Sequence, residues 1–321
     1  MIKKVVVLIC VLMLVFSLSA CKKDKDEEPY EEIPVNGVID SGSMRNTVLY
    51  FEDEYGYVVP TMRQIVWVEG IGKESLENLK SDANRNISLG EKGLLPILSM
   101  DAKIKLTIDE GVARCNLSSD ALLAENFVHE KNKVDAIINT LCEFESIDCV
   151  QILIDGQIIQ TLDNGVFIGD PLFQEDLNVE TMAEAAIGDE GRIILYFEND
   201  NTGILVPVTR LVAADINVFT VFNELIRGPK DDSGLNNIFP EGTKLLDIKV
   251  MDDKVLEVNL SKEAKGLKKT PQKEKMLLVI LTKTFEQFDN IDNVRILIDG
   301  KPYLDSAKET MATLSYINII D

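Results

Sequence analysis

The sequence contains one long internal repeat, and this feature constrains the fold more than any other. Four blocks recur in the same order, each displaced by about 145 residues, a pattern that is typical of a tandem duplication. The pairs are residues 48–52 (VLYFE) with 194–198 (ILYFE), 59–63 (VPTMR) with 206–210 (VPVTR), 116–118 (NLS) with 259–261 (NLS), and 150–156 (VQILIDG) with 294–300 (VRILIDG). We therefore expect two domains of one fold, over residues 47–165 and 191–321, joined by a linker over residues 166–190.

The residue pattern inside each copy predicts an alternation of strands and helices. In the second copy, β-branched segments at 194–198 and 204–212 flank a turn rich in Asn, which indicates a hairpin. A helical apolar face then ends at Gly228-Pro229, a second hairpin spans 246–260, a second helix follows Pro271, and a strand covers 294–298. The first copy shows the same order. We predict an α+β fold: two tandem β-β-α-β-β-α-β units, each a small mixed sheet with two helices on one face.

The N-terminus has the order of a secretory signal. Lys3 and Lys4 precede an apolar run over residues 5–16 and a group of small residues, which predicts a signal peptide over residues 1–20. The run is shorter than the roughly 20 residues of a transmembrane helix. The cleavage region, LSAC at 18–21, resembles the bacterial lipobox, which implies lipid attachment at Cys21. A plain secreted protein with an accidental Cys is the alternative.

An acylated Cys21 would make the lipid bilayer a partner and place the chain on the outer face of the cell membrane. Residues 21–46 are rich in charge and carry Pro29 and Pro34. Such a segment buries too little apolar surface to fold, so we expect a disordered tether.

Few residues suit catalysis or metal binding. His129 is the single histidine, and its polar surroundings predict a solvent-facing loop. Cys115, Cys142 and Cys149 have no cysteine counterparts in the second copy, so we expect buried thiols, with a Cys142–Cys149 disulfide as the alternative. No phosphate-binding loop, dinucleotide fingerprint or zinc-protease motif occurs. We predict no catalytic residue, no cofactor and no metal site.

Some polar residues recur in both copies, and a function that both copies share would depend on such residues. Glu52 and Glu198 end the first strand of each copy, and Arg63 and Arg210 lie in the second. We expect each Glu to form a cross-strand ion pair with the Arg of its copy, with an interface role as the alternative. The recurring Asp-Gly pairs at 155–156 and 299–300 are explained by turns with positive φ.

The charge is strongly acidic and unevenly spread. The net charge of −21 excludes a nucleic-acid partner, because phosphate binding requires basic patches. Residues 47–187 contribute −15 and residues 188–321 only −5, with a group of lysines at 262–275. We therefore expect charge to steer contacts with a partner or between copies of the chain.

The motifs of the second copy resemble those of the GerM domain of spore-forming Firmicutes, which usually occurs as a tandem pair on a lipoprotein. The matching motifs are LYF at 195–197, the Pro and Arg of 207–210, LIRGP at 225–229, FPEGTK at 239–244, VNLS at 258–261 and IDG at 298–300. The first copy departs at 78–82 (NLKSD) and keeps only the proline of the next motif at 94–97. The resemblance implies a fold like the ring-building modules of secretion systems. It also implies a role in sporulation or germination, with envelope or sporulation-complex proteins as partners.

Three classes of function compete at this point. The first is a non-enzymatic, membrane-anchored scaffold that supports the envelope complex between mother cell and forespore. The second is a lipoprotein that binds a small molecule or a cell-wall fragment, although Trp67 is the only tryptophan that could stack on a sugar. The third, an envelope hydrolase, requires a site that the sequence does not display.

Overall fold

The computed structural model describes residues 44–181, 191–213, 215–267, 270–305 and 318–320. All of them belong to one compact unit, Ser41–Asp321. The signal peptide, Cys21 and the tether up to residue 43 lie outside the described residues. The first strand begins at Met44, so the last three residues of the expected tether belong to the folded domain.

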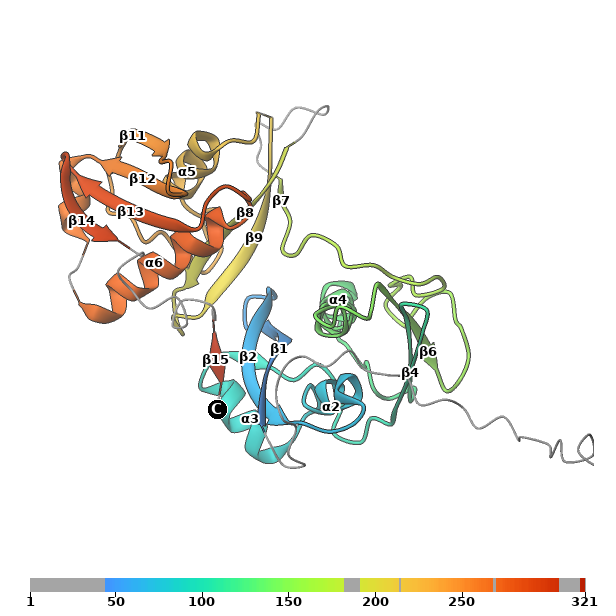
Figure 1. The fold of residues 1–321 in the computed structure, drawn as a ribbon. Coiled ribbons are helices and arrows are strands. Elements are labelled where there is room, and N and C mark those ends of the chain that lie inside the picture. The colour runs from blue at the N-terminus through green and yellow to red at the C-terminus, as the bar shows by residue number, and fades with distance from the viewer. Residues whose placement is uncertain (1–43, 182–190, 214, 268–269, 306–317, 321) are drawn as a thin grey trace, which may run out of the picture. The chain divides into compact units, whose positions relative to one another are not determined.

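The first repeat alternates strands and helices along the chain (Figure 1). Its elements are β1 (Met44–Asp53), β2 (Val58–Val66), α2 (Ile71–Glu77), α3 (Ala83–Gly90), β3 (Leu94–Leu95), β4 (Ile104–Asp109), β5 (Val112–Leu117), α4 (Phe127–Cys142) and β6 (Cys149–Ile154). Strands β1 and β2 form an antiparallel hairpin. Strands β5 and β6 are parallel, which requires a crossover, and α4 supplies it.

The second repeat follows the same order. Its elements are β8 (Gly191–Asn199), β9 (Leu205–Val212), α5 (Val218–Arg227), β10 (Leu235–Asn236), β11 (Leu245–Val250), β12 (Val255–Leu260), η2 (Lys262–Gly266), α6 (Pro271–Phe285), β13 (Asn293–Ile298) and β14 (Lys301–Asp305). Here α6 is the crossover between the parallel strands β12 and β13. The match between the repeats confirms the predicted α+β fold of two tandem units.

The arrangement of the sheets differs from the prediction in one respect. Each repeat divides its strands between two sheets, β15-β2-β1-β3 and β4-β5-β6 in the first, β10-β8-β9-β7 and β11-β12-β13-β14 in the second. Helix α4 contacts both β1 and β6, and α6 contacts both β8 and β13. The apolar faces of these helices therefore serve two sheets, with side chains such as Ile137 and Phe285 fully buried.

The turns after β6 and β13 have the positive φ angles that the two Asp-Gly pairs predict. Asp155 and Gly156 have φ of 48° and 81°, and Asp299 and Gly300 have 55° and 74°. Two successive positive φ angles suit a tight hairpin turn. After Gly300 the chain continues into β14, a strand that the sequence pattern did not predict.

The start of the expected linker is part of the folded domain. Val166 and Ile168 are buried, and the side chain of Gln151 donates to the carbonyl of Ile168 at 3.1 Å. Residues 182–190 lie outside the described part. Val166 and Ile168 therefore pack against the first repeat rather than lying in a free connection.

Two short strands join the repeats to each other. The strand β7 (Glu180–Thr181) follows the first repeat and pairs with β9 of the second, in parallel, with Glu180 opposite Arg210. The strand β15 (Ile319–Ile320) follows the second repeat and pairs with β2 of the first, with Ile320 opposite Arg63. Each repeat thus receives a strand from the chain segment that follows the other.

Candidate functional site

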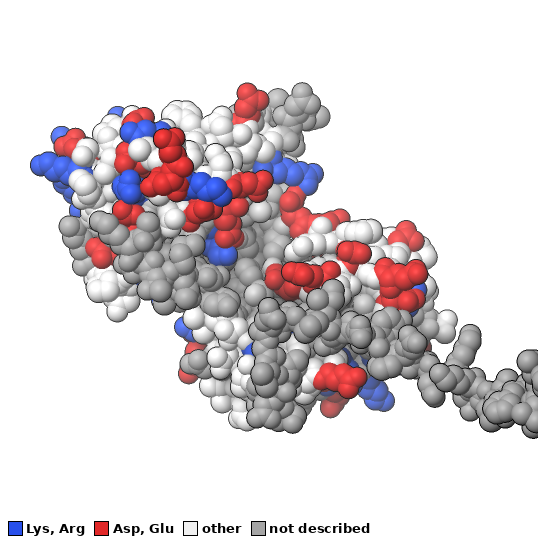
Figure 2. Space-filling model, in the orientation of Figure 1, with Lys and Arg blue, Asp and Glu red and all other residues white. Residues whose placement is uncertain are grey.

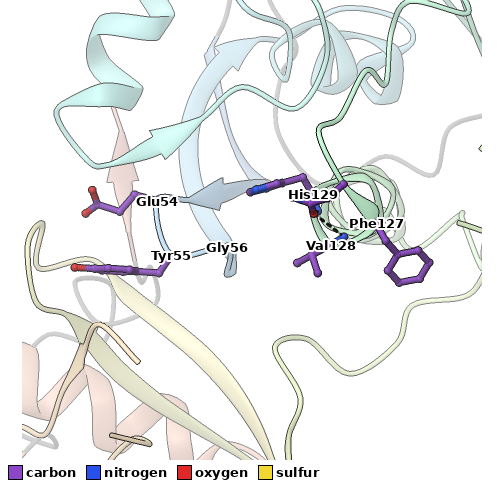
Figure 3. A pocket seen from close by; sticks show the side chains of 7 residues that line it. Glu54, Tyr55, Gly56, Phe127, Val128 and His129 are labelled. Atoms are coloured by element: carbon purple, nitrogen blue, oxygen red, sulfur yellow. Dashed lines mark hydrogen bonds between the residues drawn. The ribbon is translucent and has the colours of Figure 1, made fainter. Parts of the chain in front are cut away.

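A surface hollow lies between the β1–β2 turn and the first turn of α4. Its volume is about 460 Å³, and it is lined by Glu54, Tyr55, Gly56, Asn126, Phe127, Val128 and His129. Figure 3 shows Glu54 and Tyr55 on one side and the α4 residues on the other. Phe127 and Val128 are more than half exposed, so the rim of the hollow is apolar.

The position of Asn126 explains how α4 begins at this place. Asn126 has extended backbone angles, and its side-chain oxygen accepts hydrogen bonds from the backbone N–H of Val128 and His129. Such a cap satisfies two of the donors that every helix leaves free at its first turn. His129 therefore lies in the first turn of a helix, and the expected solvent-facing loop is wrong.

Beneath the hollow, the carboxylate of Glu52 accepts hydrogen bonds from two side chains of α4. Its Oε1 lies 2.6 Å from Nδ1 of His129 and 2.7 Å from Nδ2 of Asn132. The same Nδ2 of Asn132 donates to the carbonyl of Gly56 at 2.8 Å. The Glu52 side chain is 3% exposed, and a buried carboxylate requires such partners. The cluster fixes the β1–β2 turn to the start of α4.

The expected cross-strand pair of Glu52 with Arg63 is wrong. In the β1–β2 ladder Glu52 lies opposite Val58, whereas Arg63 lies opposite Thr47. The two side chains are therefore separated by five residues along the hairpin. Glu52 instead reaches α4, which the sequence places far downstream.

The second repeat gives the equivalent pair other partners as well. Glu198 lies opposite Leu205 in the ladder and pairs with Lys273 of α6 at 2.7 Å. Arg210 is fully buried and pairs with Glu180 of β7 at 2.9 Å and with Glu224 of α5 at 3.0 Å. Arg210 thus anchors the added strand β7, a role that the repeat alone did not reveal.

The two hairpin turns also meet each other. The Tyr55 hydroxyl donates to Asp200 at 2.7 Å, and Asn201 donates to Glu54 at 3.0 Å. The hydrogen bond to Asp200 is the main reason why the pKa of Tyr55 rises to about 12. One wall of the hollow is therefore held by the second repeat.

At the centre of this contact, Asp53 meets its equivalent residue in the second repeat. The side chain of Asn199 donates to Asp53 Oδ2 at 2.9 Å. The other oxygen of Asp53 accepts from the backbone N–H of Tyr55 and Tyr57. Burial raises the pKa of Asp53 above its ordinary value, although these hydrogen bonds oppose the rise.

The three cysteines are free thiols, and no Cys142–Cys149 disulfide is present. Cys115 and Cys149 are buried, as expected, and Cys142 is partly exposed. Burial raises the pKa of Cys115 to about 12 and that of Cys142 to about 11, which leaves both as weak nucleophiles. Within the described ranges no three His, Cys, Asp or Glu side chains gather closely enough to hold a metal ion.

No described helix has both the length and the apolar character needed to cross a bilayer. Figure 2 shows acidic side chains gathered over the first repeat and both signs mixed over the second. This distribution follows the charge difference between the two halves of the sequence.

Comparisons with known proteins agree with the two-repeat architecture. The chain is 27% identical over 271 residues to the spore germination protein GerM of Bacillus subtilis (strain 168), covering 81% of this chain and 73% of that protein. It is also similar to the solved tandem GerMN domains of the sporulation protein GerM from Bacillus subtilis. That match has a TM-score of 0.61 and 25% identity and covers 81% of this chain and 92% of the other.

The sequence model of the Germane family, described as "Sporulation and spore germination", matches residues 48–160 and 194–304. These two segments cover most of the chain and correspond to the two repeats. The chain therefore belongs to the Germane family and is a sporulation and germination protein with tandem GerM-like domains.

Proposed function

We propose that this protein is a membrane-anchored extracytoplasmic lipoprotein that acts as a non-enzymatic scaffold in sporulation or germination. Its role is to support the envelope complex between mother cell and forespore, with envelope or sporulation-complex proteins as partners. The proposal rests on the strand pairing between the repeats. The chain segment that follows each repeat adds a strand to the sheet of the other repeat. A scaffold needs interaction surfaces in a fixed relation, and main-chain pairing of this kind supplies it.

The hollow at the start of α4 is the surface that we assign to a protein partner. Phe127 and Val128 expose large apolar side chains beside the carboxylate of Glu54. Exposed apolar residues next to charged ones are typical of interaction surfaces. The acidic first repeat favours a partner whose contact surface is basic.

A gene deletion tests the role in sporulation. We expect vegetative growth to stay normal and the yield of heat-resistant spores to fall, with the defect appearing after engulfment. An unchanged spore yield together with an unchanged germination rate contradicts the proposal. Complementation with Phe127→Ala/Val128→Ala then tests the hollow, with Ile87→Ala as a control, because Ile87 is also more than half exposed but lies on α3.

Cell fractionation of Cys21→Ala tests the anchor. Loss of the thiol removes the site of acylation, so the variant should leave the membrane fraction and appear in the soluble one. Cys142→Ala is the control, because it removes a thiol that lies inside the folded domain. Unchanged membrane retention of Cys21→Ala contradicts lipid anchoring.

The alternative function, binding of a small molecule or a cell-wall fragment, has one observation in its favour. The hollow of about 460 Å³ falls within the size range of small-molecule sites, and Tyr55 offers an aromatic wall. Isothermal titration calorimetry of the protein with soluble peptidoglycan fragments tests this alternative. Saturable heat that Tyr55→Ala abolishes would favour this alternative over the scaffold.

A further inference from the structure

Two asparagines, one before each added strand, make the same three hydrogen bonds in the two halves of the molecule. Asn178 accepts from the backbone N–H of Val58 and donates to the carbonyls of Val58 and Pro207, at 2.7–2.8 Å. Asn318 accepts from the N–H of Leu205 and donates to the carbonyls of Leu205 and Pro60, at 2.8–2.9 Å. Each asparagine therefore joins the second strand of one repeat to the second strand of the other.

The residues that receive these bonds are equivalent in the repeat. Val58 and Leu205 precede the matching blocks at 59–63 and 206–210, and Pro60 and Pro207 lie inside them. A proline has a carbonyl but no N–H, so it cannot continue a regular ladder. A carboxamide side chain has both a donor and an acceptor, and it completes the pairing where the proline interrupts it.

The strands after the asparagines continue the same pattern. Glu180 lies opposite Arg210 and Ile320 opposite Arg63, which are again equivalent positions. The backbone carbonyl of Asn318 also accepts from the N–H of Met62 at 2.6 Å. Around the asparagines the two segments differ, DLNVE at 176–180 and SYINII at 315–320. Asn is thus the side chain that the two segments share, and it makes the three hydrogen bonds to the second strands.

The pairing is specific for unlike repeats. Asp53 and Asn199 are equivalent residues that meet side chain to side chain. Two first repeats would bring two carboxylates together, and two second repeats would bring together two carboxamides that already use their oxygens for backbone N–H groups. This contact therefore favours a first repeat beside a second repeat over two repeats of one kind.

We propose that the backbone of Pro60, Met62 and Leu205 forms a strand-acceptor site for an extended segment led by asparagine, and that residues 318–320 of a second copy of the chain can occupy it. Such an exchange breaks and forms the same hydrogen bonds, so the exchanged and closed forms differ mainly by the effective concentration of the strand. Exchange links copies at high local concentration and leaves single copies closed at low concentration. It stands apart from the proposed role in sporulation.

Cysteine trapping tests the exchange between copies. Ile319 and Met62 are partners in the β15–β2 ladder, and neighbouring strands lie about 4.8 Å apart, within the Cα separation that a disulfide spans. Full-length Met62→Cys is mixed with full-length Ile319→Cys, incubated at rising concentration and oxidised. We expect a covalent heterodimer that increases with concentration, whereas neither variant alone exceeds the wild type. Absence of the heterodimer, also after the two chains are refolded together, overturns the exchange.

A peptide tests the acceptor site directly. A fluorescent peptide with the sequence of residues 314–321 should bind saturably to a chain that lacks residues 318–321, and the full-length chain should bind at least tenfold more weakly because its site is occupied. A peptide with Asn318→Ala should not bind. Equal binding to both chains, or no binding to a shortened chain that still unfolds cooperatively, overturns the site. If the shortened chain does not unfold cooperatively, the trapping result decides.

Discussion

Glu52 and Glu198 lie at equivalent positions, one residue before the end of the first strand of their repeats, but their surroundings differ. Glu52 is buried beneath the α4 hollow with His129 and Asn132. Glu198 pairs with the ammonium of Lys273, whose side chain is 47% exposed. In both repeats this carboxylate joins the first strand to the long crossover helix. The duplicated carboxylate thus joins the same two elements in both repeats, while its contribution to the free energy of unfolding differs with burial.

The second strand shows the opposite behaviour. Arg210 lies opposite Glu180 of β7 and is held by a buried ion pair, whereas Arg63 lies opposite the apolar Ile320 of β15. Both added strands place the second residue after the asparagine opposite the arginine of the repeat, but the side chains across this pairing differ. Backbone geometry was therefore retained after duplication at a place where side-chain chemistry diverged.

The largest effect is expected for Arg210→Met. The substitution leaves Glu180 and Glu224 without the guanidinium that each of them contacts. Removing one partner of a buried ion pair typically costs about 3–5 kcal/mol. The free energy of unfolding, measured in urea, should fall by about this amount, and β7 should lose its amide protection from hydrogen exchange.

Arg192→Met is the control for this variant. Arg192 also pairs with a carboxylate, that of Asp176, but its side chain is 67% exposed. Exposed ion pairs contribute about 0–1 kcal/mol. Similar losses for the two variants would show that Arg210 is no anchor, and the contrast with Arg63 would then lose its basis.

The next effect concerns the two asparagines. Asn178→Ala and Asn318→Ala each remove three hydrogen bonds between the repeats. Each should lower the free energy of unfolding by about 2–3 kcal/mol, because backbone groups lose their partners. A loss confined to one of the two variants would show that the two halves of the interface are not equivalent.

A smaller effect is expected for Asp53→Asn, which turns two carboxamide donors toward each other. The cost should be about 1–2 kcal/mol. Asn199→Asp restores the acceptor from the other side, so the double variant Asp53→Asn/Asn199→Asp should recover most of the loss in a double-mutant cycle. Additive losses would contradict the pairing of these two residues.

The pKa of Asp53 predicts how this contact responds to pH. Burial raises the pKa above its ordinary value of 3.8, so the folded chain binds this proton more tightly than the unfolded chain does. The tighter proton binding stabilises the folded state below pH 3.8, and this stabilisation is lost as the pH rises through the folded pKa. The difference in unfolding free energy between the wild type and Asp53→Asn should change over this range and be flat above it.

Much of the fold follows from local sequence patterns. The Asp-Gly turns, the crossover helices and the order of elements rest on neighbouring residues and on their repetition, so they could be predicted. The division of each repeat into two sheets could not, because it depends on which distant strands pair. β7 and β15 have only two residues each, too few for any periodicity.

The candidate site could be predicted in part. Both repeats carry the glutamate of Glu52, but its partners His129 and Asn132 are not repeated as residue types. Lys273 lies three residues after the N-cap of α6, where α4 has His129, so the identical blocks gave no signal for these partners. One local signal was available: Asn126 is a favoured N-cap residue ahead of the apolar positions of α4. It would have placed His129 on a helix. Nothing in the sequence pattern pointed to Asn178 or Asn318, which lie outside the repeated blocks.

The smallest expected effect concerns Glu52 and Glu198. Glu52→Gln keeps the size of the side chain but removes the charge beside His129, so we expect a loss of about 1–2 kcal/mol. Glu198→Gln should cost about 0–1 kcal/mol, because Lys273 is well solvated. Thermal unfolding of both variants at two salt concentrations distinguishes them, since salt screens the exposed pair more than the buried one. Equal losses with equal salt dependence would contradict the difference in burial on which the comparison of the repeats depends.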